Sequence, residues 1–263
     1  MIAMSNQIEV RKNLPSGTII LNRPTSHNAL TREMLDGIRT AMEDFQGEKK
    51  VHGIILTGAG KSFCSGSDLK AIQEAAEQPD AFAIWQDDID SLQALLETML
   101  RCPKPIVVAM NGDAIGLGAA LVLAADLVVA AEDAKFSFPE STRGLSNAVG
   151  AALLAFRCGV GNASRLIYHG EPISSQEAKA FGLVHFLAPS DLVWAKAQEV
   201  ITGLGSGAPQ SHKQTKQFVN ETLGETLFTQ LSIAAAHMAS ARTTDAAREG
   251  IAAFVEKRPP KFP

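Results

Sequence analysis

The sequence predicts an α/β domain followed by a helical C-terminal region. Up to about residue 190, short apolar segments typical of strands alternate with segments whose apolar residues recur at the helical period. Beyond that point only the helical period remains. With 263 residues, 46% of them hydrophobic, the chain can bury a full-sized core. We therefore divide it into a core over residues 1–190 and a helical region over residues 191–263.

The first predicted elements are two strands, a helix and a third strand. Residues 8–11 and 18–21 have strand character and flank Pro15-Ser16-Gly17, a turn sequence. Thr31 is a good N-cap for the helix that follows. The apolar residues of that helix recur at its period and are Met34, Leu35, Ile38, Ala41, Met42 and Phe45. Residues 53–57 then form a buried strand.

A similar order returns further along the chain. Residues 71–101 have acidic, helical character, residues 106–110 and 127–130 read as buried strands, and a helix starts near Leu117. Ser174 and Glu177 form a capping box for a short helix, and Gly182 is suited to end it. The C-terminal helices are expected at residues 192–204, 208–223, 226–241 and 244–257. The pattern alone fits either a doubly wound sheet or a spiral of ββα units.

Composition argues against several classes of function. A formal net charge of −4 provides no basic surface for nucleic acid, so any bound phosphate must be met by local cations. The three cysteines and six histidines lack the spacing of a disulfide framework or a metal site. No segment resembles an export signal or a membrane span, and we expect a reducing cytoplasm.

Three motifs carry the functional information. LNRP at 21–24 is joined to NAL at 28–30, SFCSGSDLK occupies 62–70, and NGDAIGLGAA occupies 111–120. Together with FSFPE at 136–140, SQEA at 175–178, GLV at 182–184 and EGIAAFVEKR at 249–258, they resemble the enoyl-CoA hydratase/isomerase (crotonase) superfamily. The resemblance spans nearly the whole chain, and the order of the motifs is more specific than any one of them.

This resemblance implies a crotonase-like spiral of ββα units with a helical C-terminal region that assembles subunits into a trimer or a dimer of trimers. It also implies an acyl-CoA thioester as substrate, with no cofactor besides the CoA that the substrate carries. The core would hold the CoA and acyl site, and residues 71–101 would shape the acyl pocket.

The resemblance also implies the catalytic residues. Ser67 and Leu117 match two backbone N–H groups that stabilise the thioester oxygen when it becomes negative. Glu140 matches a glutamate that transfers protons. The binding residues implied for CoA and substrate are Arg23, Ala29, Ser65, Gly66, Asp68, Leu69, Lys70 and Gly116. Arg23 and Lys70 would contact phosphate or pantetheine, and Asp68 would also cap a helix.

The chain departs from the family pattern at Ala120, where many members carry a second glutamate. One acid-base group can move a proton between two carbons of an allylic system, so double-bond isomerisation is favoured over hydration. The alternatives are a hydratase with an impaired or relocated second acid, for which Asp113 is a candidate, and a non-catalytic CoA-binding homologue. Thioester hydrolysis, decarboxylation and ring chemistry use the same oxyanion hole and stay open.

Overall fold

The computed structural model describes residues 6–262, and a six-stranded sheet forms its centre. The order is β1-β2-β3-β4-β6-β9, with β1 and β2 antiparallel and the other neighbours parallel. The strands are β1 (Ile8–Asn13), β2 (Ser16–Leu21), β3 (Gly53–Gly58), β4 (Ile106–Met110), β6 (Leu127–Ala131) and β9 (Phe186–Ala188). The strands expected in the core are confirmed. Residues 1–5, part of the segment where no export signal is expected, lie outside the described residues.

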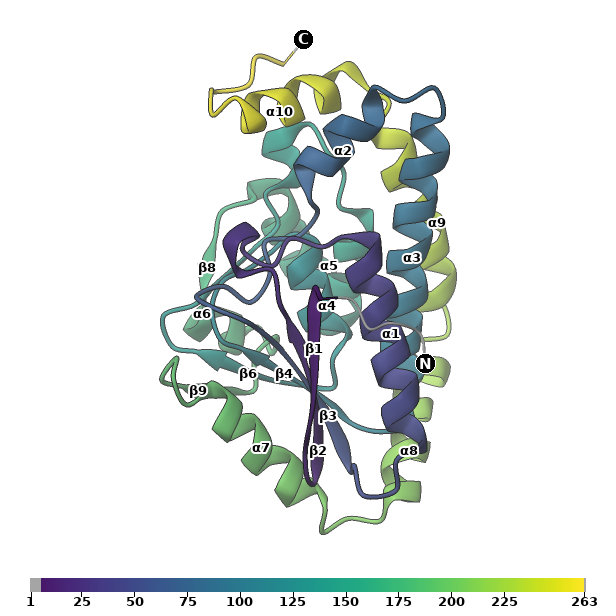
Figure 1. Ribbon diagram of the computed structural model, residues 1–263, viewed down its shortest axis with the longest axis vertical. Coiled ribbons are helices and arrows are strands. Elements are labelled where there is room, and N and C mark those ends of the chain that lie inside the picture. Colours follow the sequence, from purple (N-terminus) through teal and green to yellow (C-terminus); the bar gives the residue numbers. More distant parts are fainter. Residues whose placement is uncertain (1–5, 263) are drawn as a thin grey trace.

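Helices cover both faces of this sheet. β4 is buried along its whole length, as expected for a central strand of a parallel sheet. On one face α7 (Val193–Leu204) packs across β3, β4 and β6. In Figure 1 α7 lies on one side of the sheet, and α1 (Arg32–Gly47), α3 (Ala81–Arg101) and α9 (Leu227–Ala241) lie on the other. The core therefore forms between the sheet and two layers of helices.

A second, smaller sheet leads into the site. It has three strands in the order β5-β7-β8, with bounds Ala114–Ile115, Lys135–Ser137 and Ile173–Ser174. β5 is followed directly by Gly116 and by α4 (Leu117–Ala124). The sequence pattern did not predict these strands, because two or three residues are too few to show a period.

The predicted first helix is confirmed with its cap and its buried face. α1 starts after Thr31, whose Oγ1 accepts a hydrogen bond from the Met34 N–H at 3.2 Å. All six residues of the predicted apolar face are buried. Burying this face against the sheet and α3 is what holds the helix in place, since isolated helices of this length are marginal in water.

The acidic region 71–101 forms two helices. α2 (Leu69–Ala76) begins at Asp68, whose Oδ1 accepts from the Ala71 N–H at 3.4 Å, as the predicted cap requires. α3 begins at Ala81 after a short break. Trp85 in α3 is buried and donates from Nε1 to the Ile72 carbonyl at 3.2 Å, which ties the two helices together. This pair packs beside the candidate site.

The remaining helices lie in both the core and the C-terminal part. They are α5 (Ala148–His169), α6 (Ser175–Ala180), α8 (Pro209–Gln217), a π-helical turn η3 (Phe218–Leu223), α10 (Asp245–Val255) and two short 3-10 helices, η1 (Pro24–Ser26) and η2 (Glu140–Arg143). α9 packs on α3 and α5, and α10 packs on α2 and η2. The predicted boundary at residue 190 stays a prediction. None of the described helices is long and apolar enough to span a membrane.

Candidate active site

Three segments that are far apart in the sequence lie side by side at the site. Isolated parallel bridges pair Leu30 with Ser67 and Cys64 with Ala114. The Leu30 N–H donates to the Gly66 carbonyl at 2.8 Å, and the Ile115 N–H donates to the Cys64 carbonyl at 2.9 Å. The second motif is thus held between the first and the third, and its turn is brought next to the start of α4.

Two backbone amides at this junction have no acceptor. Within residues 6–262, neither the Ser67 N–H nor the Leu117 N–H donates a hydrogen bond to the protein. Leu117 is the first residue of α4, where the helix dipole adds partial positive charge. Gly66 has φ +88°, and a Cβ placed on it would lie 3.2 Å from the Leu117 nitrogen and 2.8 Å from the Ile115 oxygen. Glycine therefore allows the two amides to approach each other.

Glu140 lies against the same helix start. Its Oε1 accepts from Asn147 Nδ2 at 2.8 Å, whereas its buried Oε2 has no protein partner among the described residues. A Cβ on Gly116 would collide with Oε1. Gly116 has φ +57° and precedes Leu117, so its missing side chain leaves room for the carboxyl group beside one of the two free amides.

Burial raises the pKa of Glu140 from 4.5 to about 7, although the Asn147 hydrogen bond and the charge of Arg143 act in the opposite direction. At neutral pH both the carboxylate and the acid are then populated. Such a group can accept a proton from a substrate and return it without a large cost in either direction. This is the behaviour required of a single acid-base residue.

The raised pKa predicts a pH effect on stability. Between pH 4.5 and about 7 the folded chain keeps the Glu140 proton that the unfolded chain loses, so the free energy of unfolding falls as pH rises through this range. The decrease due to this residue is on the order of 3 kcal/mol. Glutamine at position 140 cannot titrate. The free energy of unfolding of Glu140→Gln, relative to that of the parent, should therefore increase as the pH rises. Urea unfolding of both proteins at pH 5 and pH 8 checks this, and parallel pH dependences would contradict it.

The carboxyl group and the amides line adjacent cavities. Glu140 lines one of about 310 Å³ with Phe138, Leu145 and Asn147, and among its described lining residues Glu140 is the only acid. Ser67 and Leu117 line another, of about 300 Å³, whose walls combine aliphatic and charged side chains. The two cavities approach each other at Gly116, because this residue contacts the Glu140 carboxyl group and directly precedes Leu117.

A larger cavity of about 780 Å³ begins at Ser67 and opens past the first two motifs. It brings together six of the eight residues predicted to bind CoA: Arg23, Ala29, Ser65, Asp68, Leu69 and Lys70. Gly66 and Gly116 are outside its lining and instead shape the amide junction. Arg143 and Phe254 also line it, with the guanidinium 4.5 Å from the ring centre. Neither was predicted to bind CoA, although Phe254 lies within the motif at 249–258, because only folding brings η2 and α10 to this cavity.

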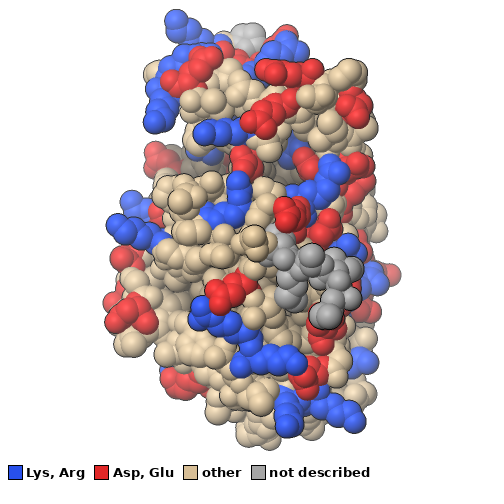
Figure 2. All heavy atoms as spheres, in the orientation of Figure 1, with Lys and Arg blue, Asp and Glu red and all other residues tan. Residues whose placement is uncertain are grey.

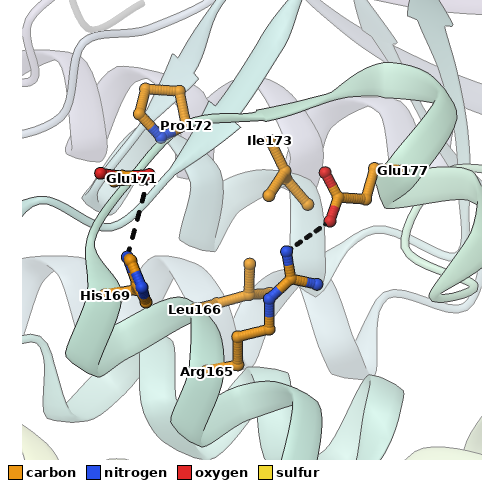
Figure 3. Close-up of a pocket in the computed structure, with 7 residues that line it drawn as sticks. All are labelled: Arg165, Leu166, His169, Glu171, Pro172, Ile173 and Glu177. Atoms are coloured by element: carbon orange, nitrogen blue, oxygen red, sulfur yellow. Dashed lines mark hydrogen bonds and ion pairs between the residues drawn. The ribbon is translucent and has the colours of Figure 1, made fainter.

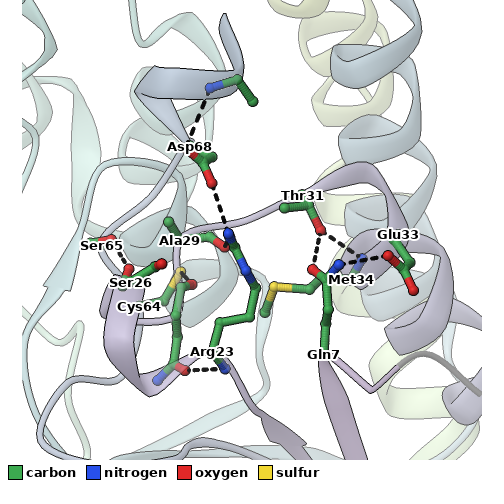
Figure 4. A network of polar contacts seen from close by, with 12 residues as sticks. Gln7, Arg23, Ser26, Ala29, Thr31, Glu33, Met34, Cys64, Ser65 and Asp68 are labelled. Atoms are coloured by element: carbon green, nitrogen blue, oxygen red, sulfur yellow. Dashed lines mark hydrogen bonds and ion pairs between the residues drawn. The ribbon is translucent and has the colours of Figure 1, made fainter. Parts of the chain in front are cut away.

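Arg23 is already committed to protein partners. Its Nη1 donates to the Ala29 carbonyl at 2.6 Å, and its Nη2 forms an ion pair with Asp68 Oδ2 at 3.0 Å (Figure 4). This network fixes the first motif against the start of α2. Lys70, in contrast, is exposed at the cavity, and it and Arg143 are the more available cations for a phosphate.

Neither Ala120 nor Asp113 supplies a second acid beside Glu140. Ala120 is fully buried in α4. Asp113 lines the large cavity, but its Oδ1 accepts from the Lys135 N–H at 2.8 Å, so it acts as a turn residue that links β5 to β7. Neither residue lines the cavity that contains Glu140.

Comparisons with known proteins identify the family of this chain. The model of the enoyl-CoA hydratase/isomerase family matches residues 16–263. The chain belongs to the enoyl-CoA hydratase/isomerase family. It is 34% identical to a putative enoyl-CoA hydratase of Thermus thermophilus, covering 93% of this chain and 96% of that protein. It is 32% identical to the 2,3-dehydroadipyl-CoA hydratase of Escherichia coli, with 93% of each covered.

The fold of this member of the enoyl-CoA hydratase/isomerase family is shared with solved structures. It is similar to an enoyl-CoA hydratase from Mycobacterium avium subsp. paratuberculosis, with a TM-score of 0.86, 28% identity and 98% of both chains covered. The predicted crotonase-like fold with a helical C-terminal region is therefore confirmed. An acyl-CoA thioester is the type of substrate consistent with this family.

Another pocket with charged residues is a weaker candidate for the site of this family member. A pocket of about 200 Å³ near the end of α5 contains Arg165, His169, Glu171 and Glu177, but Arg165 is bonded to Glu177 and His169 faces Glu171 (Figure 3). On the face shown in Figure 2, basic and acidic side chains are interspersed. This agrees with the absence of a broad basic field expected from the net charge of −4.

Proposed function

We propose that this protein transfers a proton on an enoyl-CoA thioester, with Glu140 as its single acid-base group, and that it moves the double bond. The observation that carries this proposal is the buried Glu140 carboxyl group, with an unpartnered Oε2 and a pKa of about 7, beside a helix start with a free amide. Ala120 leaves no second glutamate in α4 to position water. The residues therefore suit transfer between two carbons better than addition of water.

The proposed reaction starts from a 3-enoyl thioester with its carbonyl oxygen at the Ser67 and Leu117 amides. The Glu140 carboxylate removes a proton from C2, and the electron pair of that C–H bond delocalises through C1 onto the thioester oxygen. The two N–H groups stabilise this negative charge, each contributing roughly 2.7 to 4 kcal/mol. Protonated Glu140 then returns the proton to C4, and the double bond moves from C3–C4 to C2–C3.

The test is turnover of the purified protein on paired 3-enoyl-CoA and 2-enoyl-CoA substrates of several chain lengths. Conversion of 3-enoyl to 2-enoyl thioesters, with slower addition of water, is the expected result. Chromatography of the products distinguishes the shifted alkene from the 3-hydroxyacyl thioester. Hydration at the higher rate would refute the preference for isomerisation.

Hydration is the second candidate, because the names of the relatives favour it. The proteins of T. thermophilus and E. coli are both named hydratases. In a hydratase, Glu140 would supply the proton to C2, and water would attack C3 from a position fixed by another group. Asp113 would have to give up its hydrogen bond with the Lys135 amide to serve this role. An Asp113→Asn variant that loses hydration would support the second candidate.

We also propose that the subunits assemble into a trimer or a dimer of trimers. Large apolar side chains on α5, η3 and α9 are exposed in the single chain, and they include Val160, Tyr168, Phe218, Leu223 and Ile233. Contact between subunits would remove such side chains from water. Sedimentation equilibrium measures the mass of the assembly, and a monomer at micromolar concentration would contradict this proposal.

A further inference from the structure

A buried arginine with an unpartnered nitrogen stands at the end of α9. Arg242 is 7% exposed, and its Nη1 has no hydrogen-bond partner in the described part of the chain. Asp88 Oδ2 lies 4.0 Å from this nitrogen, which is beyond hydrogen-bond distance. Burial lowers the pKa of Arg242 to about 10, so the guanidinium is still charged at neutral pH. Asp88 thus offsets the charge of Arg242 without accepting a hydrogen bond from Nη1, and a buried donor without an acceptor is costly.

The acidic groups around Arg242 already have other partners. Asp88 Oδ1 accepts from Arg32 Nε at 3.0 Å and from Arg32 Nη2 at 2.9 Å, so two guanidinium groups share one carboxylate. Asp87 is exposed and lies 3.6 Å from Arg32. Glu33 is exposed on α1 and accepts from Gln7 Nε2 at 2.6 Å. Asp68 at the start of α2 is paired with Arg23. None of these groups satisfies Arg242 Nη1.

Arg242 faces the cavity that begins at the two free amides. The same cavity of about 300 Å³ is lined by Ser67 and Leu117 and by Arg242. Its other lining residues come from α1, α2, α3 and the segment before α1. Apolar side chains, among them Leu30, Ile72, Ile84, Ile89 and Leu92, form one part of this wall, and Thr31, Arg32, Glu33, Asp68 and Asp88 form the rest. A thioester held at the amides would extend its acyl chain along this wall. The volume is at the lower end of the range for ligand pockets, which favours a short chain.

We propose that this cavity selects an enoyl-CoA whose acyl chain ends in a carboxylate, and that Arg242 binds that carboxylate. The proposal rests on the proposed function, because that function places the thioester at Ser67 and Leu117. A terminal carboxylate would give the buried guanidinium a charge-assisted hydrogen bond. A terminal methyl group would leave Nη1 unpaired, with its desolvation uncompensated. Arg242 would therefore determine which group the protein accepts at the far end of the acyl chain, away from the reacting carbons.

The test compares two saturated thioesters that differ only at the far end of the acyl chain: hexanoyl-CoA and hexanedioyl-CoA, which carries a carboxylate there. Calorimetry measures the Kd of each for the parent protein, for Arg242→Met and for Arg242→Lys. We expect the parent to bind the dicarboxylic thioester roughly ten- to hundredfold more tightly. Arg242→Met should abolish this preference, chiefly by weakening binding of the dicarboxylic thioester. Arg242→Lys should keep part of it, because the positive charge remains.

A matched control is Arg248→Met on α10, which removes an exposed arginine paired with Asp245 and should keep the full preference. Equal affinities in the parent protein, or a preference that persists in folded Arg242→Met, would overturn the proposal. Thermal unfolding shows whether that variant is folded, and if it is not, the parent and Arg242→Lys decide the question.

Saturated thioesters cannot undergo the double-bond shift, so these affinities do not depend on catalysis. A parent protein that prefers the dicarboxylic ligand but turns over no enoyl-CoA would support the role of Arg242 and refute the proposed function. Turnover without any preference for the carboxylate would refute only the role of Arg242. Failure of the parent to bind either thioester would overturn both.

Discussion

Replacing Glu140 with glutamine is expected to lower kcat on enoyl thioesters by roughly 10²- to 10⁴-fold, the range for loss of one general acid-base group. Glutamine keeps the shape of the side chain, and its oxygen can still accept from Asn147 Nδ2 as Glu140 Oε1 does. It has no proton to exchange at neutral pH. Because the CoA cavity is lined by other residues, thioester binding should persist. Steady-state kinetics and calorimetry on the same preparation measure the two effects separately.

Glu132→Gln is the matched control, since Glu132 is exposed and lines neither the Glu140 cavity nor the CoA cavity. It should turn over substrate like the parent. A non-catalytic CoA-binding homologue predicts another pattern, in which the parent shows no turnover and all three proteins bind CoA thioesters alike. Full turnover by Glu140→Gln would refute the single-base mechanism and make Asp113 the next acid to replace.

Replacing Gly66 with alanine is the second substitution with a large expected effect. The new Cβ would lie 2.8 Å from the Ile115 oxygen and 3.2 Å from the Leu117 nitrogen, and φ at this position is +88°. The turn must shift away from α4, which separates the Ser67 and Leu117 amides. Because misplacing one oxyanion donor costs about 10²- to 10³-fold in kcat, we expect a loss of that order. The strained φ should also lower the free energy of unfolding by roughly 1–2 kcal/mol.

Gly203→Ala is the control, because it shows how replacing a glycine elsewhere changes kcat and the free energy of unfolding. Gly203 lies within α7, and a Cβ there would have no heavy atom within 4 Å. Alanine is a better helix former, so this variant should be more stable by roughly 0.4–1 kcal/mol and keep its kcat. Thermal unfolding and enoyl-CoA turnover of both variants provide the comparison. A Gly66→Ala protein with parental kcat would exclude the two amides as the oxyanion site.

Much of the fold could be predicted because its elements carry long, local patterns. The apolar face of α1 and the caps at Thr31, Asp68 and Ser174 are present in the sequence and in the structure. Short elements were missed, since the two or three residues of β5, β7 and β8 give no measurable period. The pattern likewise gave no warning of the break that separates α2 from α3.

Some features of the candidate site could also be predicted from the sequence, and others could not. Gly66 and Gly116 stand in recognisable turns, and the structure shows why side chains would be excluded there. Asn147 and Arg242 carry no motif, yet one bonds Glu140 and the other faces the predicted acyl cavity. Arg23 was predicted as a phosphate contact, but its ion pair with Asp68 appears only when the first two motifs are brought together.

The sequence by itself determined the order of the longer strands and helices, because these follow from residue types at fixed local spacing. Through the resemblance of its motifs it also determined the family and implied Glu140 as the candidate acid. Only the tertiary structure decided that the carboxyl group of Glu140 is buried, with a pKa of about 7, and that the Ser67 and Leu117 amides lack acceptors. It also decided that Arg242, whose buried Nη1 lacks a hydrogen-bond acceptor, lines the same cavity as those amides. Desolvation and hydrogen-bond satisfaction depend on atoms from distant segments, and no local pattern records them.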